Sequence, residues 1–368
     1  MERFRWLKVV AVLICLFFAV SEGRELKIKH NGNVPIYNHT LATILVEYAS
    51  AVYMSDLTAL ITWTCSRCSD MTEGFEVIEL VVDVQHCLQV CSLFLVAIEA
   101  SNCYPYCYYN FISLVTYNPD SVKCIQNWIE DLFWKQLDLN YPGMPDAMVH
   151  CGFYSAYHNT TLRPRVLLAV QRAKELYGDL GIMVTGHSMG GAMASFCALD
   201  LAVNQGEHNV QVMTFGQPRV GNSIFASYFS KHLPNTIRIT NENDMVPHLP
   251  PYYTYFPHKT YHHFPREVWL YNIGLGSLVY TVEKICDASG EDPACCRSVS
   301  GNSIADHLKY FGVQLQAESW GSCRIVMVDR SMIKDNVDLN GNFALSRDPT
   351  TSVIKLSTEM DTGHRSAE

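Results

Sequence analysis

A serine stands between two glycines at the point where an apolar strand pattern changes into a small-residue helix pattern. Ile182-Met183-Val184-Thr185 is followed directly by Gly186-His187-Ser188-Met189-Gly190, and small residues continue to about residue 203. A tight strand-to-helix turn brings the positions two before and two after the serine close to neighbouring backbone, so glycine fits both. The turn lifts the hydroxyl clear of the sheet and points the next backbone N–H at the same space. Ser188 is therefore a candidate nucleophile, and the N–H of Met189 is a candidate oxyanion donor.

Strand and helix patterns alternate on both sides of this serine. Apolar residues recur at three or four positions along 162–176, which predicts a helix, and a similar pattern over 224–232 predicts another. Short apolar runs at 210–215 and 236–240 predict buried strands. Strands that alternate with helices indicate an α/β fold, in which a mostly parallel central sheet is covered by helices on both faces.

A serine hydroxyl is a weak nucleophile until a base takes its proton, and the base in turn needs an orienting carboxylate. After a turn of this kind the partners follow in the order serine, acid, histidine. Asp244 comes just past the strand predicted at 236–240, where a sheet presents its catalytic groups. Glu242 is the competing carboxylate, and its place in the loop is more typical of a solvated charge.

Six histidines follow this aspartate and are candidates for the base: His248, His258, His262, His263, His307 and His364. His248 is too near the aspartate in sequence to swing over the serine, and His364 lies in a weakly patterned polar region. His262 and His263 precede a predicted strand, where a structural role is favoured. His307 begins an amphipathic segment after a Gly/Ser-rich loop, and by elimination it is the best base.

The first 23 residues have the pattern of a signal peptide. Basic residues precede an apolar run from Val9 to Val20, and small residues follow it. The run is too short to span the ~30 Å of hydrocarbon in a bilayer. An uncleaved anchor is the alternative, and no later stretch reaches transmembrane length. The pattern predicts a secreted protein or one held in the lumen of the secretory pathway.

The cysteine content and the net charge are consistent with a secreted protein. The chain has 14 cysteines among 368 residues, which is too dilute for a small disulfide scaffold. Cys65 and Cys68 could form a redox or zinc pair, but no second ligand pair follows at suitable spacing, so a disulfide is favoured. Asn38 and Asn159 begin N-glycosylation sequons. The net charge of −9 argues against a general nucleic-acid binder.

Taken together, these motifs resemble the class 3 lipases, the family of the secreted fungal triacylglycerol lipases and many plant relatives. The matching stretches run in family order through residues 125–312, and they are 127–132, 149–157, 184–194, 214–222, 244–250, 266–269 and 306–311. The resemblance implies an α/β-hydrolase domain over residues 24–325. It also implies Ser188 as nucleophile, His307 as general base and Asp244 as its orienting carboxylate, with Met189 as oxyanion donor.

The resemblance implies a secreted serine carboxylester hydrolase that cleaves acyl esters of glycerolipids at a lipid–water interface, with no metal and no cofactor. It further implies a lid, a short helix over the serine with a large apolar face, made by Ile125, Trp128, Ile129, Leu132 and Phe133. An ordinary buried helix is the alternative for that spacing. Cys286 and Cys295 resemble a loop-closing bridge of the family, for which Cys296 is a competing partner.

One stretch departs from the family. The family ends a buried strand in Arg-Gly-Thr or Arg-Gly-Ser before the lid to supply a second oxyanion donor, and this chain has no Arg-Gly dipeptide. Residues 90–124 are foreign to the pattern, although 111–116 can form the strand, with Thr116 or Ser121 as surrogate donor. Losing one donor typically costs ~10²–10³ in rate. The alternative function is therefore a catalytically impaired, lipase-like protein that binds lipid. Residues 326–368 are predicted to be a polar, disordered tail.

Overall fold

The computed structural model describes most of the chain beyond its first 36 residues, and all described residues lie in one unit that spans residues 35–368. The described ranges are 37–68, 70–73, 75–83, 91–99, 109–117, 135–179, 181–252, 260–275, 278–316 and 343–346. The predicted signal peptide and the predicted lid residues lie outside them. Among the described residues, no helix has the length and apolar character needed to cross a membrane.

A nine-stranded sheet forms the centre of this unit, in the order β10-β9-β8-β7-β6-β3-β2-β1-β13. The five middle strands run parallel, and they are β3 (Tyr109–Tyr117), β6 (Gly181–His187), β7 (Val210–Phe215), β8 (Thr236–Asn241) and β9 (Glu267–Leu275). Antiparallel strands close both edges, and they are β10 (Leu278–Ile285), β2 (Cys91–Glu99), β1 (Phe75–Asp83) and β13 (Phe343–Ser346). The strands predicted at 182–185, 210–215 and 236–240 are confirmed.

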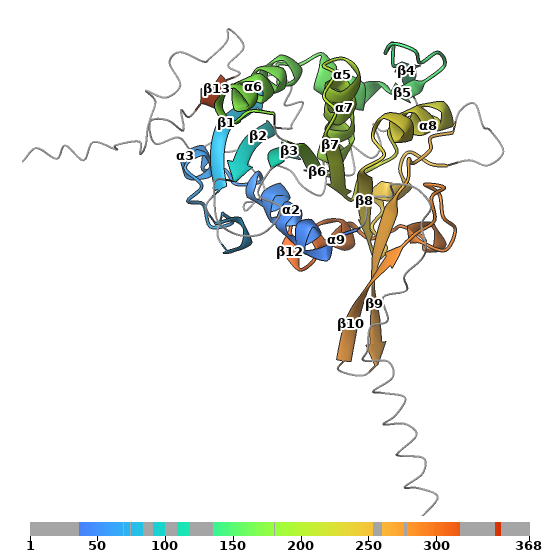
Figure 1. The fold of residues 1–368 in the computed structure, drawn as a ribbon. Helices are drawn as coiled ribbons and strands as arrows, with labels where there is room; N and C mark the ends of the chain where they lie inside the picture. Colours follow the sequence, from blue (N-terminus) through green and yellow to red (C-terminus); the bar gives the residue numbers. More distant parts are fainter. Residues whose placement is uncertain are drawn as a thin grey trace, which may run out of the picture. The chain divides into compact units, whose positions relative to one another are not determined.

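Helices cover both faces of the sheet (Figure 1). One face packs against α5 (Cys151–His158), α6 (Leu162–Tyr177), α7 (Met189–Val203) and α8 (Ser223–His232). The other face packs against α2 (His39–Ala51) and α3 (Leu57–Ile61). Successive residues of β6 alternate between the two cores, because side chains along a strand point to opposite faces. The two helices predicted over 162–176 and 224–232 are confirmed as α6 and α8.

Short elements connect these layers. They are β4 (Gln136–Asp138), β5 (Met148–His150), α9 (Ile304–His307), β11 (Lys309–Tyr310), β12 (Val313–Gln314) and the 3₁₀ turns Asp70–Thr72, Val246–His248 and Cys296–Ser298. The segment predicted to be amphipathic around residue 307 is thus one helical turn followed by a short β-hairpin. Its turn begins at Ser303, whose side chain accepts a hydrogen bond from the backbone N–H of Asp306.

The segment that departs from the family pattern contributes two of the nine strands. β2 pairs antiparallel with β3, and β3 pairs parallel with β6, in a register that sets Leu114 opposite Gly186. The strand expected at 111–116 therefore lies within β3. The prediction of a disordered tail over residues 326–368 is wrong for Phe343–Ser346, which pairs with β1 as the outermost strand of the sheet. The domain consequently extends past residue 325.

Candidate active site

Ser188 stands at the turn between β6 and α7 with a backbone that non-glycine residues rarely adopt. Its φ is 58° and its ψ is −131°. The surrounding structure holds this strained conformation, since the serine N–H donates to the Phe215 carbonyl at 2.9 Å and its own carbonyl accepts from Gly191 at 2.9 Å. A side chain on Gly191 would place its Cβ 3.0 Å from the Gln217 side chain. The turn thus needs a small residue at 191 as well, which the motif did not indicate.

Three residues far apart in the chain meet at this turn. His307 Nε2 lies 2.9 Å from Ser188 Oγ, and His307 Nδ1 lies 2.9 Å from Asp244 Oδ2. The carboxylate can only accept, so Nδ1 carries the hydrogen and Nε2 presents its lone pair to the serine hydroxyl. The structure therefore brings together the predicted serine, histidine and aspartate in a geometry suited to general-base activation of a hydroxyl.

Asp244 is 2% exposed, and both of its carboxylate oxygens have partners in addition to the histidine. The Tyr310 hydroxyl donates to Oδ2 at 2.5 Å, and the Val246 backbone N–H donates to Oδ1 at 2.9 Å. Burial, and then the negative charge of the aspartate, raises the pKa of Tyr310 well above its ordinary value. The tyrosine therefore stays protonated and keeps donating. Its role was not predicted, although it lies three residues after His307, in β11, in a stretch that carried the family resemblance.

Comparisons with known proteins agree with this geometry. A family model described as Lipase (class 3) matches residues 121–254. The lipase of Rhizomucor miehei is 36% identical over 194 residues, 51% of this chain and 49% of that protein. The secreted mono- and diacylglycerol lipase 1 of Fusarium solani is 29% identical over 58% of this chain and 60% of that protein. The chain spans about half the length of the curated relatives it matches.

Solved structures extend the match to 75–79% of this chain. A lipase from Rhizopus microsporus var. chinensis superposes with a TM-score of 0.61 at 25% identity, over 79% of this chain and 94% of that one. The triacylglyceride lipase of Rhizomucor miehei superposes with a TM-score of 0.59 at 30% identity, over 75% and 94%. A triacylglycerol lipase whose catalytic centre is a serine protease triad matches at 30% identity, over 77% and 98%, with a TM-score of 0.59.

The chain belongs to the class 3 lipase family. Its fold is the α/β-hydrolase fold, as the sequence predicted.

Gly216 sets the space in which this member of the class 3 lipase family holds its aspartate and histidine. It follows β7 with a φ of +58°. A Cβ there would lie 2.9 Å from Asp244 Oδ2, His307 Nδ1 and the Tyr310 hydroxyl alike. Any side chain would therefore displace the group that orients the imidazole. No sequence pattern singles out this glycine, because its neighbours come from two loops distant in the chain.

His187, the residue before the serine, holds the backbone of the general-base candidate, His307. Its Nε2 lies 2.8 Å from the His307 carbonyl, which can only accept, so Nε2 carries the hydrogen. Its Nδ1 then accepts from the Tyr53 hydroxyl at 2.7 Å. Burial, and then the charge of His307, lowers the pKa of His187 well below its ordinary value. The ring stays neutral and keeps both hydrogen bonds in fixed directions.

The competing candidates have structural partners elsewhere. His248 Nδ1 lies 3.0 Å from the Asp244 backbone carbonyl, and His263 Nε2 lies 2.8 Å from the Pro247 carbonyl. Glu242 accepts a hydrogen bond from the backbone N–H of Asn272 at 2.7 Å. His262 bonds the carbonyl of its neighbour. His258 and His364 lie outside the described residues.

Two cysteine pairs are joined as expected. Cys65 is bonded to Cys68, and Cys286 is bonded to Cys295. Cys296 keeps a free, buried thiol beside the second bridge. Asp292 lies close to the Cys286 and Cys295 sulfur atoms, and within the described ranges this is the one cluster with the residue types of a metal site. Because its two sulfur atoms form the disulfide, they are not thiolate ligands.

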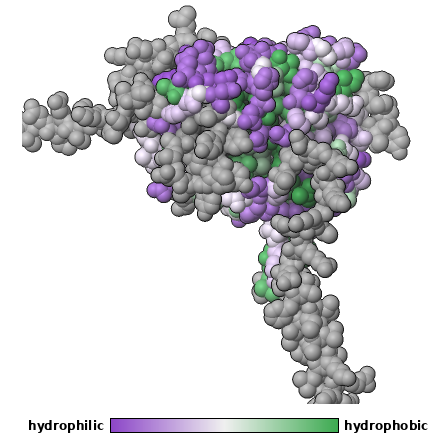
Figure 2. Space-filling model, viewed as in Figure 1, coloured by the Kyte–Doolittle hydropathy of each residue, from purple (hydrophilic) through white to green (hydrophobic). Residues whose placement is uncertain are grey.

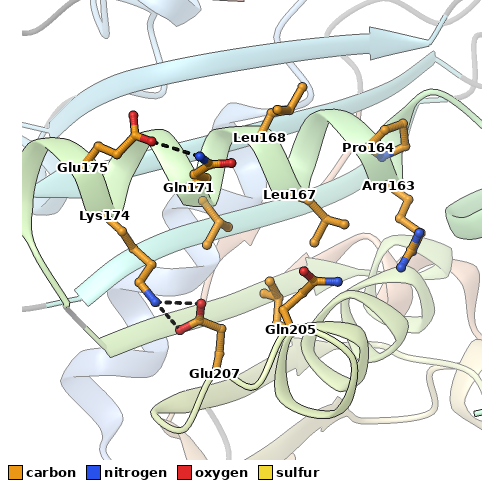
Figure 3. Close-up of a pocket in the computed structure, with 11 residues that line it drawn as sticks. Arg163, Pro164, Leu167, Leu168, Gln171, Lys174, Glu175, Gln205 and Glu207 are labelled. Carbon is orange, nitrogen blue, oxygen red and sulfur yellow. Dashed lines mark hydrogen bonds and ion pairs between the residues drawn. The ribbon is translucent and has the colours of Figure 1, made fainter. Parts of the chain in front are cut away.

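A cavity of about 750 Å³ lies away from the triad, between α6 and the C-terminal part of α7 (Figure 3). Its two cations already have carboxylate partners. Lys174 Nζ lies 2.8 Å from both carboxylate oxygens of Glu207, and Arg163 bonds Asp200. The cavity therefore offers no uncompensated charge to an anionic ligand, and none of its lining residues belongs to the triad.

Proposed function

We propose that this chain is a serine carboxylester hydrolase that cleaves acyl esters of glycerolipids through an acyl-enzyme intermediate. The observation that carries the proposal is the unbroken series of hydrogen bonds from Ser188 through His307 to Asp244, at the C-terminal edge of the sheet. Membership of the class 3 lipases and the lipase activities named for its relatives support the substrate class.

The triad would act in two stages. Ser188 Oγ attacks the ester carbonyl carbon while His307 Nε2 takes the hydroxyl proton, and the histidine then protonates the leaving alcohol. Water repeats the sequence on the acyl-enzyme and releases the fatty acid. Asp244 holds the imidazole in one tautomer and stabilises the imidazolium that forms at each stage. The chemistry needs no metal or organic cofactor.

The oxyanion site is assigned to two elements. Met189 is the first residue of α7, so its backbone N–H lies at a helix N-terminus, where partial positive charge favours an anion. Thr116 is the surrogate for the second donor that the family supplies through Arg-Gly-Thr. Leu114, two residues before Thr116, pairs with Gly186, two residues before Ser188, and this pairing supports Thr116 as the surrogate. Ser121, the other surrogate, and the lid helix remain proposals outside the described residues.

Secretion is part of the proposal. Two disulfides favour an oxidising compartment, as does the signal-peptide pattern over 1–23. Asn159 is exposed after α5, which suits a glycan acceptor. Asn38, the first residue of the other sequon, caps α2 by accepting the Leu41 backbone N–H through Oδ1.

Covalent labelling tests the proposal and separates it from the alternative of an impaired, lipid-binding protein. A fluorophosphonate should label the parent chain at Ser188 and should not label Ser188→Ala. Ser195→Ala is the matched control, because Ser195 is a buried serine two turns further along α7 that bonds the Gly191 carbonyl. The control should label like the parent and release fatty acid from a triacylglycerol emulsion. A well-folded parent that takes no label would contradict the proposal and favour the alternative.

A further inference from the structure

The hairpin of β9 and β10 projects beyond the sheet edge that carries the triad. β9 runs parallel to β8, and their last paired residues are Asn241 and Leu270. β9 then continues for five more residues, to Leu275, which is about 16 Å at ~3.3 Å per residue. Asp244 follows the end of β8, and parallel strands end at a common edge. The hairpin therefore extends past the edge where Ser188 and Asp244 lie. Figure 1 shows β9 and β10 projecting beyond the other strands of the sheet.

The outer part of this hairpin exposes large apolar side chains. Ile273, Leu278, Val279 and Tyr280 are 51%, 53%, 65% and 59% exposed. Five of the eight exposed large hydrophobic side chains in the described part of the chain belong to this hairpin, and these four lie at its outer end. Figure 2 shows apolar surface on the hairpin where it leaves the rest of the unit. Because Val279 and Tyr280 are neighbours on one strand, the outer end exposes apolar groups on both of its faces.

Charge is absent from the same segment. Residues 271–275 and 278–282, called the hairpin tip below, contain no Asp, Glu, Lys, Arg or His. Exposed edge strands in water usually carry charges that prevent association, so a charge-free, apolar edge is a binding surface. Tyr271 and Tyr280 add the amphipathic rings that suit a boundary between water and hydrocarbon. A protein of net charge −9 gains no electrostatic attraction from an anionic surface.

We propose that the hairpin tip inserts into the surface of an uncharged lipid aggregate and anchors the chain with its triad edge facing the lipid. The proposal rests on the proposed function, because a glycerolipid aggregate is then the substrate phase. The position of the tip on the triad edge favours a lipid surface over a second copy of the chain. Docking of a second copy to β10 would cover one side of the hairpin and would not require both faces to be apolar.

Vesicle binding tests this anchor separately from hydrolysis. The full chain carrying Ser188→Ala is mixed with phosphatidylcholine vesicles that contain triolein, and the bound fraction is measured by flotation. Adding Val279→Asp should lower the vesicle partition coefficient at least tenfold, and adding Leu278→Ser should also lower it. Ile285→Asp is the matched control, because Ile285 is 61% exposed at the base of the hairpin, and it should change the coefficient less than twofold.

A local measurement and a soluble substrate complete the test. Vesicles should slow amide hydrogen exchange in the hairpin tip and leave exchange in α6 unchanged, although α6 exposes Leu168. In the chain that keeps Ser188, the Val279→Asp variant should hydrolyse a dissolved short-chain ester as the parent does. If the parent does not hydrolyse the dissolved ester, the proposed function is contradicted. The vesicle measurement does not depend on hydrolysis and still tests the anchor proposal. The anchor proposal would be overturned if the partition coefficient fell equally in the tip and base variants, or if it fell in neither. It would also be overturned if the tip substitution only dissociated a dimer.

Discussion

Two buried aspartates occupy similar surroundings in this protein, and only one belongs to the triad. Asp200, in α7, is fully buried and accepts hydrogen bonds from Nε and Nη2 of Arg163, at 2.7 and 3.0 Å. Asp244 is 2% exposed and accepts a hydrogen bond from His307 Nδ1. Each also accepts a hydrogen bond from a tyrosine hydroxyl. Burial and hydrogen bonding therefore do not distinguish the two carboxylates.

The difference lies in the cation. The guanidinium beside Asp200 is charged at all relevant pH values, so the pair is a fixed ion pair that joins α6 to α7. The imidazole beside Asp244 can be neutral or charged, and its other nitrogen faces a serine hydroxyl. Under the proposed function, a buried carboxylate contributes to catalysis when its partner can gain and lose a proton next to a nucleophile.

The matched pair Asp244→Asn and Asp200→Asn gives the largest expected difference. The first change should lower kcat by about 10⁴, because an amide can favour the wrong imidazole tautomer and cannot stabilise the imidazolium. The second should leave kcat near the parent value and lower the free energy of unfolding by about 3 kcal/mol, because the Arg163 guanidinium loses its anion. Ester hydrolysis and urea denaturation measure the two effects. Similar kcat losses in both variants would remove the distinction.

The two tyrosines offer a smaller version of the same contrast. Tyr310→Phe removes the donor to Asp244 Oδ2, and we expect kcat to fall about tenfold, equivalent to about 1.4 kcal/mol, because the carboxylate loses one of its fixing contacts. Tyr157→Phe removes the donor to Asp200 and should lower the free energy of unfolding by about 1 kcal/mol with kcat unchanged. An unaltered kcat in Tyr310→Phe would show that the remaining contacts hold the aspartate.

The histidine near Asp200 gives the smallest effect, seen through pH. Burial lowers the pKa of His158 from 6.5 to about 4, and its Nε2 accepts the Tyr141 hydroxyl at 2.7 Å. Between these two pH values the unfolded chain binds a proton that the folded chain does not. Stability should therefore fall as pH falls from 6.5 to 4.

His158→Gln keeps a hydrogen-bonding side chain without the titration, so its unfolding free energy should depend less steeply on pH than that of the parent. His208→Gln is the control, because His208 is exposed. Urea denaturation at pH 7 and pH 5 measures the difference. The same slope in all three chains would contradict the assignment to His158.

The sequence was sufficient for the features that depend on local pattern and chain order. The glycines around Ser188 mark a tight turn, the apolar runs mark the strands on either side, and the acid and histidine follow in a known order. Elimination among six histidines led to His307, the histidine that the structure sets 2.9 Å from the Ser188 hydroxyl. The departure over 90–124 was visible as a missing dipeptide, but its two strands could be placed only by their pairing.

Contacts between distant segments were beyond the reach of the sequence. Gly216, His187 and Tyr310 matter because two loops, 63 residues apart at Asp244 and His307, fold over the end of β7. Phe343–Ser346 looked like part of a polar tail, and it is a strand because β1 offers it an open edge. Sequence pattern did not single out Ile273, Leu278, Val279 and Tyr280. Only the tertiary structure shows that these side chains are exposed, because β9 extends beyond its neighbour β8. Sequence pattern therefore determined the chemistry of the triad, whereas packing between distant segments decided how it is held and which apolar surface remains outside.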